Sequence, residues 1–148
     1  TSHANIIIPD DAIRGAYITQ RNSDHYGSLS PFMRAALLGG YTKEGKEWIE
    51  ALMEFSGENE KIVRDFFAEN FPKVHFCRHR AGTLLWADFR EMGTEEEVYA
   101  WFQKAGVEPD LGSKYGEKGR GFLRLQIGMP KRELNYALER IKKAYVKE

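Results

Sequence analysis

A long amphipathic stretch that ends at a proline divides this sequence into two halves with different periodicities. From about Thr42 to Phe71, apolar residues recur at helical spacing and form one stripe. Pro72 ends the pattern, because proline lacks a backbone N–H and clashes inside a helix. The sequence therefore predicts one long helix followed by shorter elements. The stripe consists of Trp48, Ile49, Leu52, Met53, Phe55, Ile62, Val63, Phe66 and Phe67.

Three shorter segments precede the long helix. Ile6 to Ile8 is a β-branched run that favours a short strand. A helix is expected from Asp11 to Arg21, with aspartates at its start as caps. Ser30 and Pro31 are typical of an N-cap and a first helical residue, and they predict a helix through Leu38.

After Pro72 the pattern predicts strand, strand, helix, strand, strand, helix. Val74 to Arg78 and Leu84 to Phe89 are typical of short antiparallel strands. The segment from Thr94 to Glu97 is a capping box, and its glutamates are interpreted as charges that favour a helix start. Pro130 begins a final amphipathic helix. The expected fold class is α+β, with a small antiparallel or mixed sheet covered by helices.

One strand of the second half carries an arginine on its outer face. Leucine and isoleucine side chains at 123, 125 and 127 alternate with Phe122, Arg124 and Gln126. The planar donor fork of Arg124 on a rigid strand suits a carboxylate, which it can bind with two parallel charge-assisted hydrogen bonds. Alternatively, Arg124 is a surface residue whose stem covers apolar neighbours.

Composition limits the classes of partner. The 22 basic and 22 acidic side chains cancel, so no net field favours nucleic acid or an anionic membrane. The single cysteine, Cys77, excludes an internal disulfide framework. With no long uncharged apolar run in the sequence, a cytoplasmic protein is the expectation.

Two candidate sites are weighed against simpler interpretations. His75, Cys77 and His79 alternate along one expected strand and could present three zinc ligands on one face, but a fourth ligand is missing and the spacing matches no common zinc motif. No metal is therefore predicted. The glycine-rich, basic segment from Lys114 to Gly121 lacks the Gly-Lys-Ser/Thr of a phosphate-binding loop, and it is interpreted as a flexible connection between strands.

Five segments taken together carry a resemblance to one protein family. They are Asn5 to Asp10, Gly45 to Ile49 with Asn59, Leu84 to Arg90, Gly106 to Gly116, and Gly121 to Pro130. In order and spacing they are similar to the C-terminal domain of fold type I, class I/II aminotransferases that depend on pyridoxal 5'-phosphate (PLP). The resemblance is to the MalY/PatB-type cystathionine β-lyases, which are C–S lyases.

The resemblance implies that this chain and an upstream part of the same enzyme carry different functional residues. It implies that Arg124, in the best-matching segment, pairs with the α-carboxylate of an amino-acid substrate. PLP would be held by a lysine before residue 1, no lysine of this chain would take that role, and the chain alone would be inactive. When intact, the enzyme would form a homodimer and catalyse β-elimination or transamination.

The same resemblance implies a domain organisation. Residues 1–40 would be the end of a large domain with its linker, and residues 41–148 a C-terminal small domain that begins with the long interdomain helix. Ile6 to Ile8 and the first half of that helix would then expose apolar surface in the isolated chain. The alternative hypothesis is a stand-alone α+β module that binds a protein partner or a small carboxylate through the face that carries Arg124.

Overall fold

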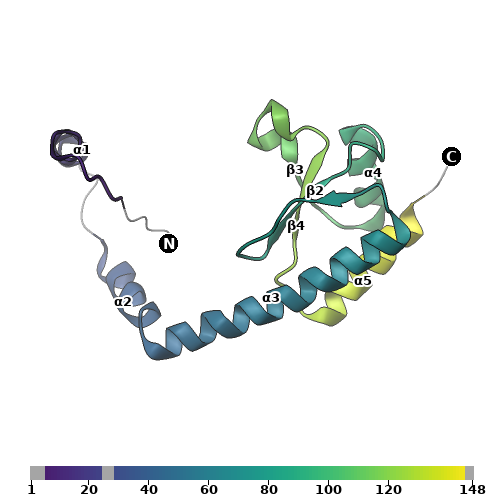
Figure 1. Ribbon diagram of the computed structural model, residues 1–148, viewed down its shortest axis with the longest axis horizontal. Helices are drawn as coiled ribbons and strands as arrows, with labels where there is room; N and C mark the ends of the chain where they lie inside the picture. The colour runs from purple at the N-terminus through teal and green to yellow at the C-terminus, as the bar shows by residue number, and fades with distance from the viewer. Residues whose placement is uncertain (1–5, 25–28, 146–148) are drawn as a thin grey trace. The chain divides into compact units, whose positions relative to one another are not determined.

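The protein, described by a computed structural model over residues 6–24 and 29–145, consists of helices and short strands in nearly the predicted order (Figure 1). It divides into two compact units, Thr1–Ile49 and Glu50–Glu148. The elements are α1 (Asp11–Ser23), α2 (Pro31–Gly40), α3 (Lys43–Asn70), β1 (His75–Phe76), β2 (Leu84–Asp88), α4 (Glu95–Ala105), β3 (Asp110–Leu111), the 3-10 turns η1 (Gly112–Tyr115) and η2 (Glu117–Gly119), β4 (Phe122–Gln126) and α5 (Lys131–Ala144).

The first unit contains helices that begin where their capping residues predict. The Asp10 side chain accepts a 2.8 Å hydrogen bond from the backbone N–H of Ile13 at the start of α1. Ser30 does the same for Met33 at the start of α2. Neither helix buries a residue. The prediction of a strand at Ile6 to Ile8 is wrong: within the described residues this run pairs with no strand, and a strand needs a neighbour to satisfy its backbone.

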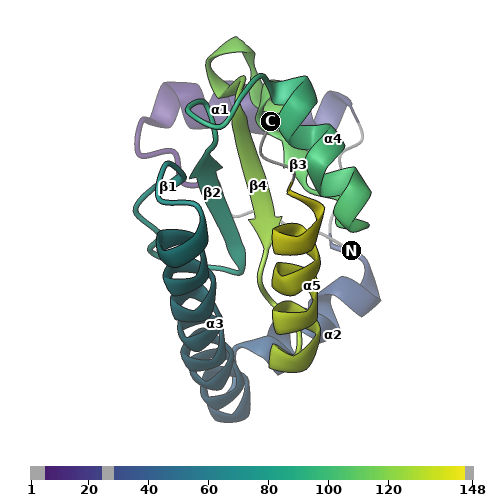
Figure 2. The same cartoon turned by 90° about the vertical axis from the view of Figure 1, so that its right-hand side faces the viewer.

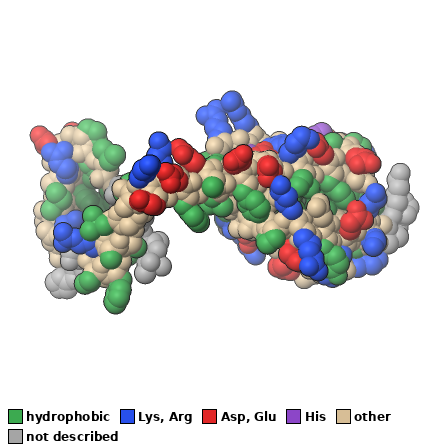
Figure 3. Space-filling model, turned by 90° about the horizontal axis from the view of Figure 1, so that it is seen from below, with side chains coloured by type: hydrophobic (Ala, Val, Ile, Leu, Met, Phe, Trp, Pro, Cys, Tyr) green, Lys and Arg blue, Asp and Glu red, His purple; other side chains and the backbone are tan. Residues whose placement is uncertain are grey.

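The long helix is confirmed as α3, and its apolar stripe lies in two environments. Trp48 and Ile49, near its start, are 66% and 44% exposed. Val63 and Phe67, in its second half, are 2% and 0% exposed. Hydrophobic side chains are visible along the surface of the early part of the chain (Figure 3). The periodicity of the sequence thus predicts the helix correctly. The buried residues of this helix all lie after its exposed first turns.

The second unit is built on a four-stranded antiparallel sheet with the order β1-β2-β4-β3. Helices α3 and α5 lie in front of β2 and β4, and α4 packs beside α5 (Figure 2). The α+β fold with a helix-covered sheet is confirmed. β1 is shorter than the predicted Val74 to Arg78: the strand ladder with β2 contains only His75 and Phe76, and the Cys77 backbone N–H adds one 2.9 Å hydrogen bond to the Trp86 carbonyl.

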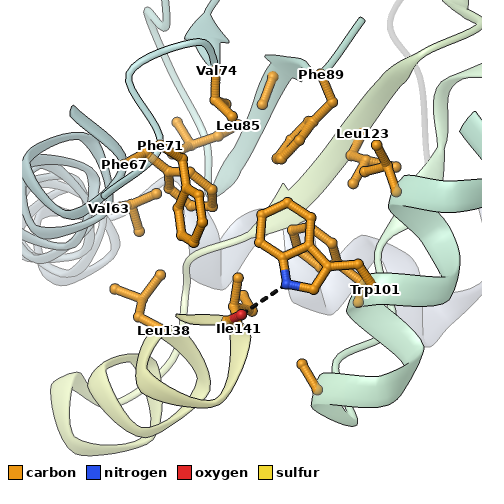
Figure 4. Packing of buried hydrophobic residues seen from close by; sticks show 14 of the residues in the cluster. Val63, Phe67, Phe71, Val74, Leu85, Phe89, Trp101, Leu123, Leu138 and Ile141 are labelled. Atoms are coloured by element: carbon orange, nitrogen blue, oxygen red, sulfur yellow. Dashed lines mark hydrogen bonds between the residues drawn. The ribbon is translucent and has the colours of Figure 1, made fainter. Parts of the chain in front are cut away.

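A hydrophobic core fills the space between the covered face of the sheet and the three helices (Figure 4). The fully buried rings of Phe67, Phe89 and Phe102 come from α3, the residue that follows β2, and α4. Edge-to-face contacts join them, with the Phe89 centroid 5.8 Å from that of Phe67 and 5.5 Å from that of Phe102. The indole N–H of Trp101 donates a 2.8 Å hydrogen bond to the carbonyl of Ile141, which ties α4 to α5. This core fixes the sheet and therefore the side chains on its other face.

The last helix, α5, follows Pro130 as predicted, and its inward residues Leu134, Leu138 and Ile141 are buried. Its last turn carries Lys142 and Lys143, which complement the negative end of the helix dipole. Across residues 6–24 and 29–145, no helix has both the length and the apolar character of a membrane span.

Candidate carboxylate-binding site

Arg124 lies in the middle of β4 on the face of the sheet that points away from the core. Its strand neighbours Leu123 and Leu125 point to the opposite face, and Leu123 is 1% exposed. In the register of the sheet, Arg124 is directly opposite Trp86 of β2 on one side and Asp110 of β3 on the other. Its side chain remains 33% exposed. The strand pairing on both sides holds its backbone rigidly, while the guanidinium reaches solvent.

Asp110 binds one edge of the Arg124 guanidinium. Nε and Nη2 of Arg124 both donate to Oδ2 of Asp110, at 3.0 and 2.5 Å. The other oxygen, Oδ1, lies 3.7 Å from Nζ of Lys114. The hydrogen bonds and charge of Arg124 outweigh desolvation and hold the pKa of Asp110 below its ordinary value, and the same pair raises the pKa of Arg124. Asp110 is therefore ionised at neutral pH, and the positive charge of Arg124 balances its negative charge.

An aromatic ring covers one face of the same guanidinium, and two further rings extend from it across the sheet. Its central carbon lies 4.9 Å from the centroid of the Tyr115 ring, a cation–π distance. Tyr115 is in edge contact with Trp86, with centroids 5.5 Å apart, and Trp86 stacks on Phe122 at 5.8 Å. A second arginine, Arg90, lies 4.8 Å above the Phe122 ring and pairs with Asp88. The exposed face of the sheet is thus a row of rings and guanidinium groups.

The glycine-rich segment connects β3 to β4 as predicted, and it forms two 3-10 turns. Gly112 and Gly119 face each other across the segment: a Cβ on Gly112 would lie 2.1 Å from the carbonyl oxygen of Gly119, and one on Gly119 would lie 2.2 Å from that of Gly112. Only glycine permits this backbone contact. The contact closes the segment that presents Tyr115.

Glu95 anchors this segment to α4. It is 6% exposed, and its carboxylate accepts hydrogen bonds from the Ser113 hydroxyl at 2.5 Å and from the Gly121 backbone N–H at 3.0 Å. Burial raises the pKa of Glu95, but these hydrogen bonds together outweigh it and the pKa lies below its ordinary value. The capping box of Thr94 and Glu97 is confirmed. The interpretation of Glu95 as only a helix-start charge is wrong, because its partners lie far along the sequence.

The three residues weighed as zinc ligands are engaged separately. His75 lies 3.6 Å from Glu91, and Nδ1 of His79 lies 2.6 Å from Oε2 of Glu60. Cys77 is exposed. Within the described part of the chain, no group of three or more histidine, cysteine or acidic residues is placed to hold a metal ion. The alternation of His75, Cys77 and His79 does not bring three ligands together, because β1 contains only His75 and Phe76.

Comparison with known proteins identifies relatives over nearly the whole chain. No protein-family model matches the sequence. The chain is 33% identical to cystathionine beta-lyase PatB of Bacillus subtilis over 143 residues, which cover 94% of the chain and 36% of that protein. It is 29% identical to protein MalY of Escherichia coli, over 86% of the chain and 33% of that protein. The chain spans about a third of the length of the curated relatives it matches.

Solved structures agree with these sequence matches. A PLP-bound putative aminotransferase from Clostridium difficile superposes with a TM-score of 0.83 at 26% identity, over 93% of this chain and 36% of that one. Cystalysin from Treponema denticola, whose structure contains PLP, gives the same TM-score at 27% identity, over 93% and 35%. By sequence and by fold, the chain belongs to the fold type I PLP-dependent enzyme family, in its MalY/PatB branch of C–S lyases.

Proposed function

We propose that this chain is the C-terminal part of a PLP-dependent C–S β-lyase or aminotransferase that acts on amino acids, and that Arg124 binds the α-carboxylate of the substrate. The observation that carries the proposal is the arginine itself: a guanidinium on a strand paired on both sides, lying outside the core and open to solvent over a third of its side chain. An amino acid presents a carboxylate, and a planar donor fork binds that group in one defined orientation.

The rigidity of Arg124 supports a role in orientation as well as affinity. Its backbone is held between β2 and β3, and its side chain is held by Asp110 and Tyr115. A substrate carboxylate bound to such a group has little freedom to rotate. Precise placement of a substrate against its reacting partner accounts for a large share of enzymatic rate enhancement. Loss of Arg124 is therefore expected to weaken both binding and turnover.

We expect the cofactor lysine to lie outside the described residues. A lysine that forms a Schiff base with PLP is activated by desolvation or by a neighbouring cation. Every lysine in residues 6–24 and 29–145 is exposed, and Lys114, which lies on the same face as Arg124, has its ammonium beside Asp110. The proposal therefore places the cofactor lysine in another part of the protein and assigns to this chain the binding of the substrate carboxylate.

Kinetics of the complete enzyme test the role of Arg124. Arg124→Ala is expected to raise KM for the amino-acid substrate and to lower kcat/KM by at least about a hundredfold, because two charge-assisted hydrogen bonds to the substrate are lost. Arg124→Lys keeps the charge but not the fork, and it is expected to recover only part of the loss. Unchanged kinetics for Arg124→Ala would contradict the proposal.

The absorbance spectrum of this chain incubated with PLP tests whether the cofactor lysine lies outside this chain. Free PLP and lysine-bound PLP absorb at different wavelengths, so the two states are distinguishable without any substrate. We expect the spectrum of free PLP only. A lysine-bound band that disappears in Lys114→Gln would contradict the proposal, because it would place a cofactor lysine within this chain.

A further inference from the structure

We propose that Asp110 is a positioning residue that holds one edge of the Arg124 guanidinium and so directs the substrate carboxylate to the other edge. The inference rests on the function proposed above and adds how Asp110 orients the Arg124 guanidinium toward the substrate. A guanidinium has two donor edges in its plane: a side edge formed by Nε and Nη2, and an end edge formed by Nη1 and Nη2. Asp110 uses the side edge, because Nε and Nη2 both donate to its Oδ2.

The end edge is the edge that remains for a substrate. Within the described residues, the hydrogen bonds of the Arg124 side chain all go to Asp110, and none involves Nη1. The ring of Tyr115 lies against the guanidinium face at 4.9 Å. Tyr115 is itself in contact with Trp86. With one face covered and the side edge bound, a carboxylate meets two parallel donors only by approaching in the plane at the end edge.

The charges of the cluster favour one further anion. Arg124 and Lys114 each carry a positive charge, and Asp110 between them carries one negative charge. The sum is one net positive charge on an exposed face, which a single carboxylate neutralises. Without Asp110, two cations would repel each other within one site. Asp110 therefore moderates the charge of the site while it fixes the direction of the arginine.

A competing interpretation makes the opposite prediction. If Asp110 occupied the place of the substrate carboxylate, it would act as an internal competitor, and its removal would tighten substrate binding. Positioning predicts the reverse, because a guanidinium released from Asp110 gains rotamer freedom that binding must remove again. The sign of the change in KM separates the two.

The kinetic test uses Asp110→Asn in the complete enzyme, with Asp88→Asn as a matched control. Asp88 binds Arg90 through the same Nε and Nη2 edge, at 2.9 and 2.6 Å, but at a different position of the sheet. Asp110→Asn is expected to raise KM about tenfold with a smaller change in kcat, since it weakens the orientation of Arg124 without removing it. Asp110→Glu is expected to recover part of the loss, and Asp88→Asn to leave KM unchanged.

A second test is spectroscopic and needs no turnover. In the 1H–15N NMR spectrum of this chain, the Nε–H signal of Arg124, identified by its loss in Arg124→Lys, is expected to be slow to exchange with water and to broaden in Asp110→Asn. Addition of N-acetylglycine, an amino-acid carboxylate without a free amine, is expected to shift the Arg124 Nη signals and to leave Nε–H in place. Displacement of the Nε–H signal would show that the carboxylate replaces Asp110 and would overturn the inference.

The outcomes separate this inference from the function on which it rests. A raised KM in Arg124→Ala together with an unchanged or lowered KM in Asp110→Asn overturns the positioning role and leaves the carboxylate role of Arg124 intact. Unchanged kinetics in both variants overturns both. Thermal unfolding of each variant shows whether a raised KM in Asp110→Asn comes from a folded protein, and the NMR signal of Arg124 decides the case if Asp110→Asn unfolds.

Discussion

The carboxylate of Glu95, in the first turn of α4, accepts a 3.0 Å hydrogen bond from the backbone N–H of Gly121, which lies immediately before β4. The same carboxylate also binds the Ser113 hydroxyl. One buried side chain therefore connects the helix, the segment that carries Tyr115 and the strand that carries Arg124. The geometry of the exposed face depends on this contact although Glu95 is not part of that face.

Glu95→Gln is expected to lower the free energy of unfolding by about 1–3 kcal/mol, because an amide cannot accept all the hydrogen bonds that the buried carboxylate accepts. Chemical denaturation of this chain measures the loss. Glu96→Gln is the control: Glu96 is the next residue, with an exposed side chain that pairs across the surface with Arg120. Equal effects of the two substitutions would contradict the role of Glu95.

The pH dependence of this contact has a defined sign. The pKa of Glu95 is lowered in the folded chain, so the folded state binds the Glu95 proton more weakly than the unfolded state does. Its contribution to stability is complete above the unfolded pKa of about 4.3 and is lost as the pH falls through the lower folded value. The difference in unfolding free energy between the unmodified chain and Glu95→Gln is expected to be constant near neutral pH and to shrink below about pH 4. A difference that grows on acidification would exclude this linkage.

Asn59→Asp tests the connection between α3 and the segment that follows β4. Asn59 is fully buried, and its Nδ2 donates to the carbonyls of Ile127 at 2.7 Å and Met129 at 2.8 Å. The isosteric aspartate replaces this donor with an oxygen that repels both carbonyls. We expect a loss of about 3 kcal/mol in unfolding free energy. Asn70→Asp, at a half-buried position whose Nδ2 donates to the Phe66 carbonyl, is expected to lose less.

Gly119→Ala tests the closed form of the segment between β3 and β4. The added Cβ would lie 2.2 Å from the backbone oxygen of Gly112, so one of the two turns must shift. We expect a lower melting temperature and a change in the fluorescence of Trp86, which contacts Tyr115 of the same segment. Gly57→Ala is the contrasting substitution. A methyl group added at Gly57 would have no atom within 4 Å, and in the middle of α3 alanine is expected to stabilise by about 0.5–1 kcal/mol.

The local signals of the sequence predict the helices well, and the reason is physical. Ser30 and Thr94 act through hydrogen bonds to residues three positions away, so the information that starts these helices is contained in the segment itself. Likewise, the alternation around Arg124 is sufficient to place its guanidinium outside the core, because successive side chains of a strand point to opposite faces. The family resemblance and the outward position of this arginine are both available from the sequence.

Contacts between distant residues are what the sequence does not reveal. Asp110 meets Arg124 only because β3 pairs with β4 in one register, and a shift by one residue would turn the carboxylate away. Glu95 resembles a helix-start charge in its local context, and its burial becomes apparent only with the positions of Ser113 and Gly121. The wrong prediction of a strand at Ile6 to Ile8 has the same cause. A strand needs a partner strand, and the sequence of the run does not show whether one is present.

The two environments along α3 have a consequence for how this helix opens to solvent. Near Trp48 the helix has no buried side chain, so its backbone hydrogen bonds open through local fraying at little cost in free energy. Around Phe67 the same helix opens only when the core is disrupted. Deuterium uptake along this one helix will therefore rise steeply toward its N-terminal end, and protection factors measured residue by residue will mark where the cooperative folding unit begins.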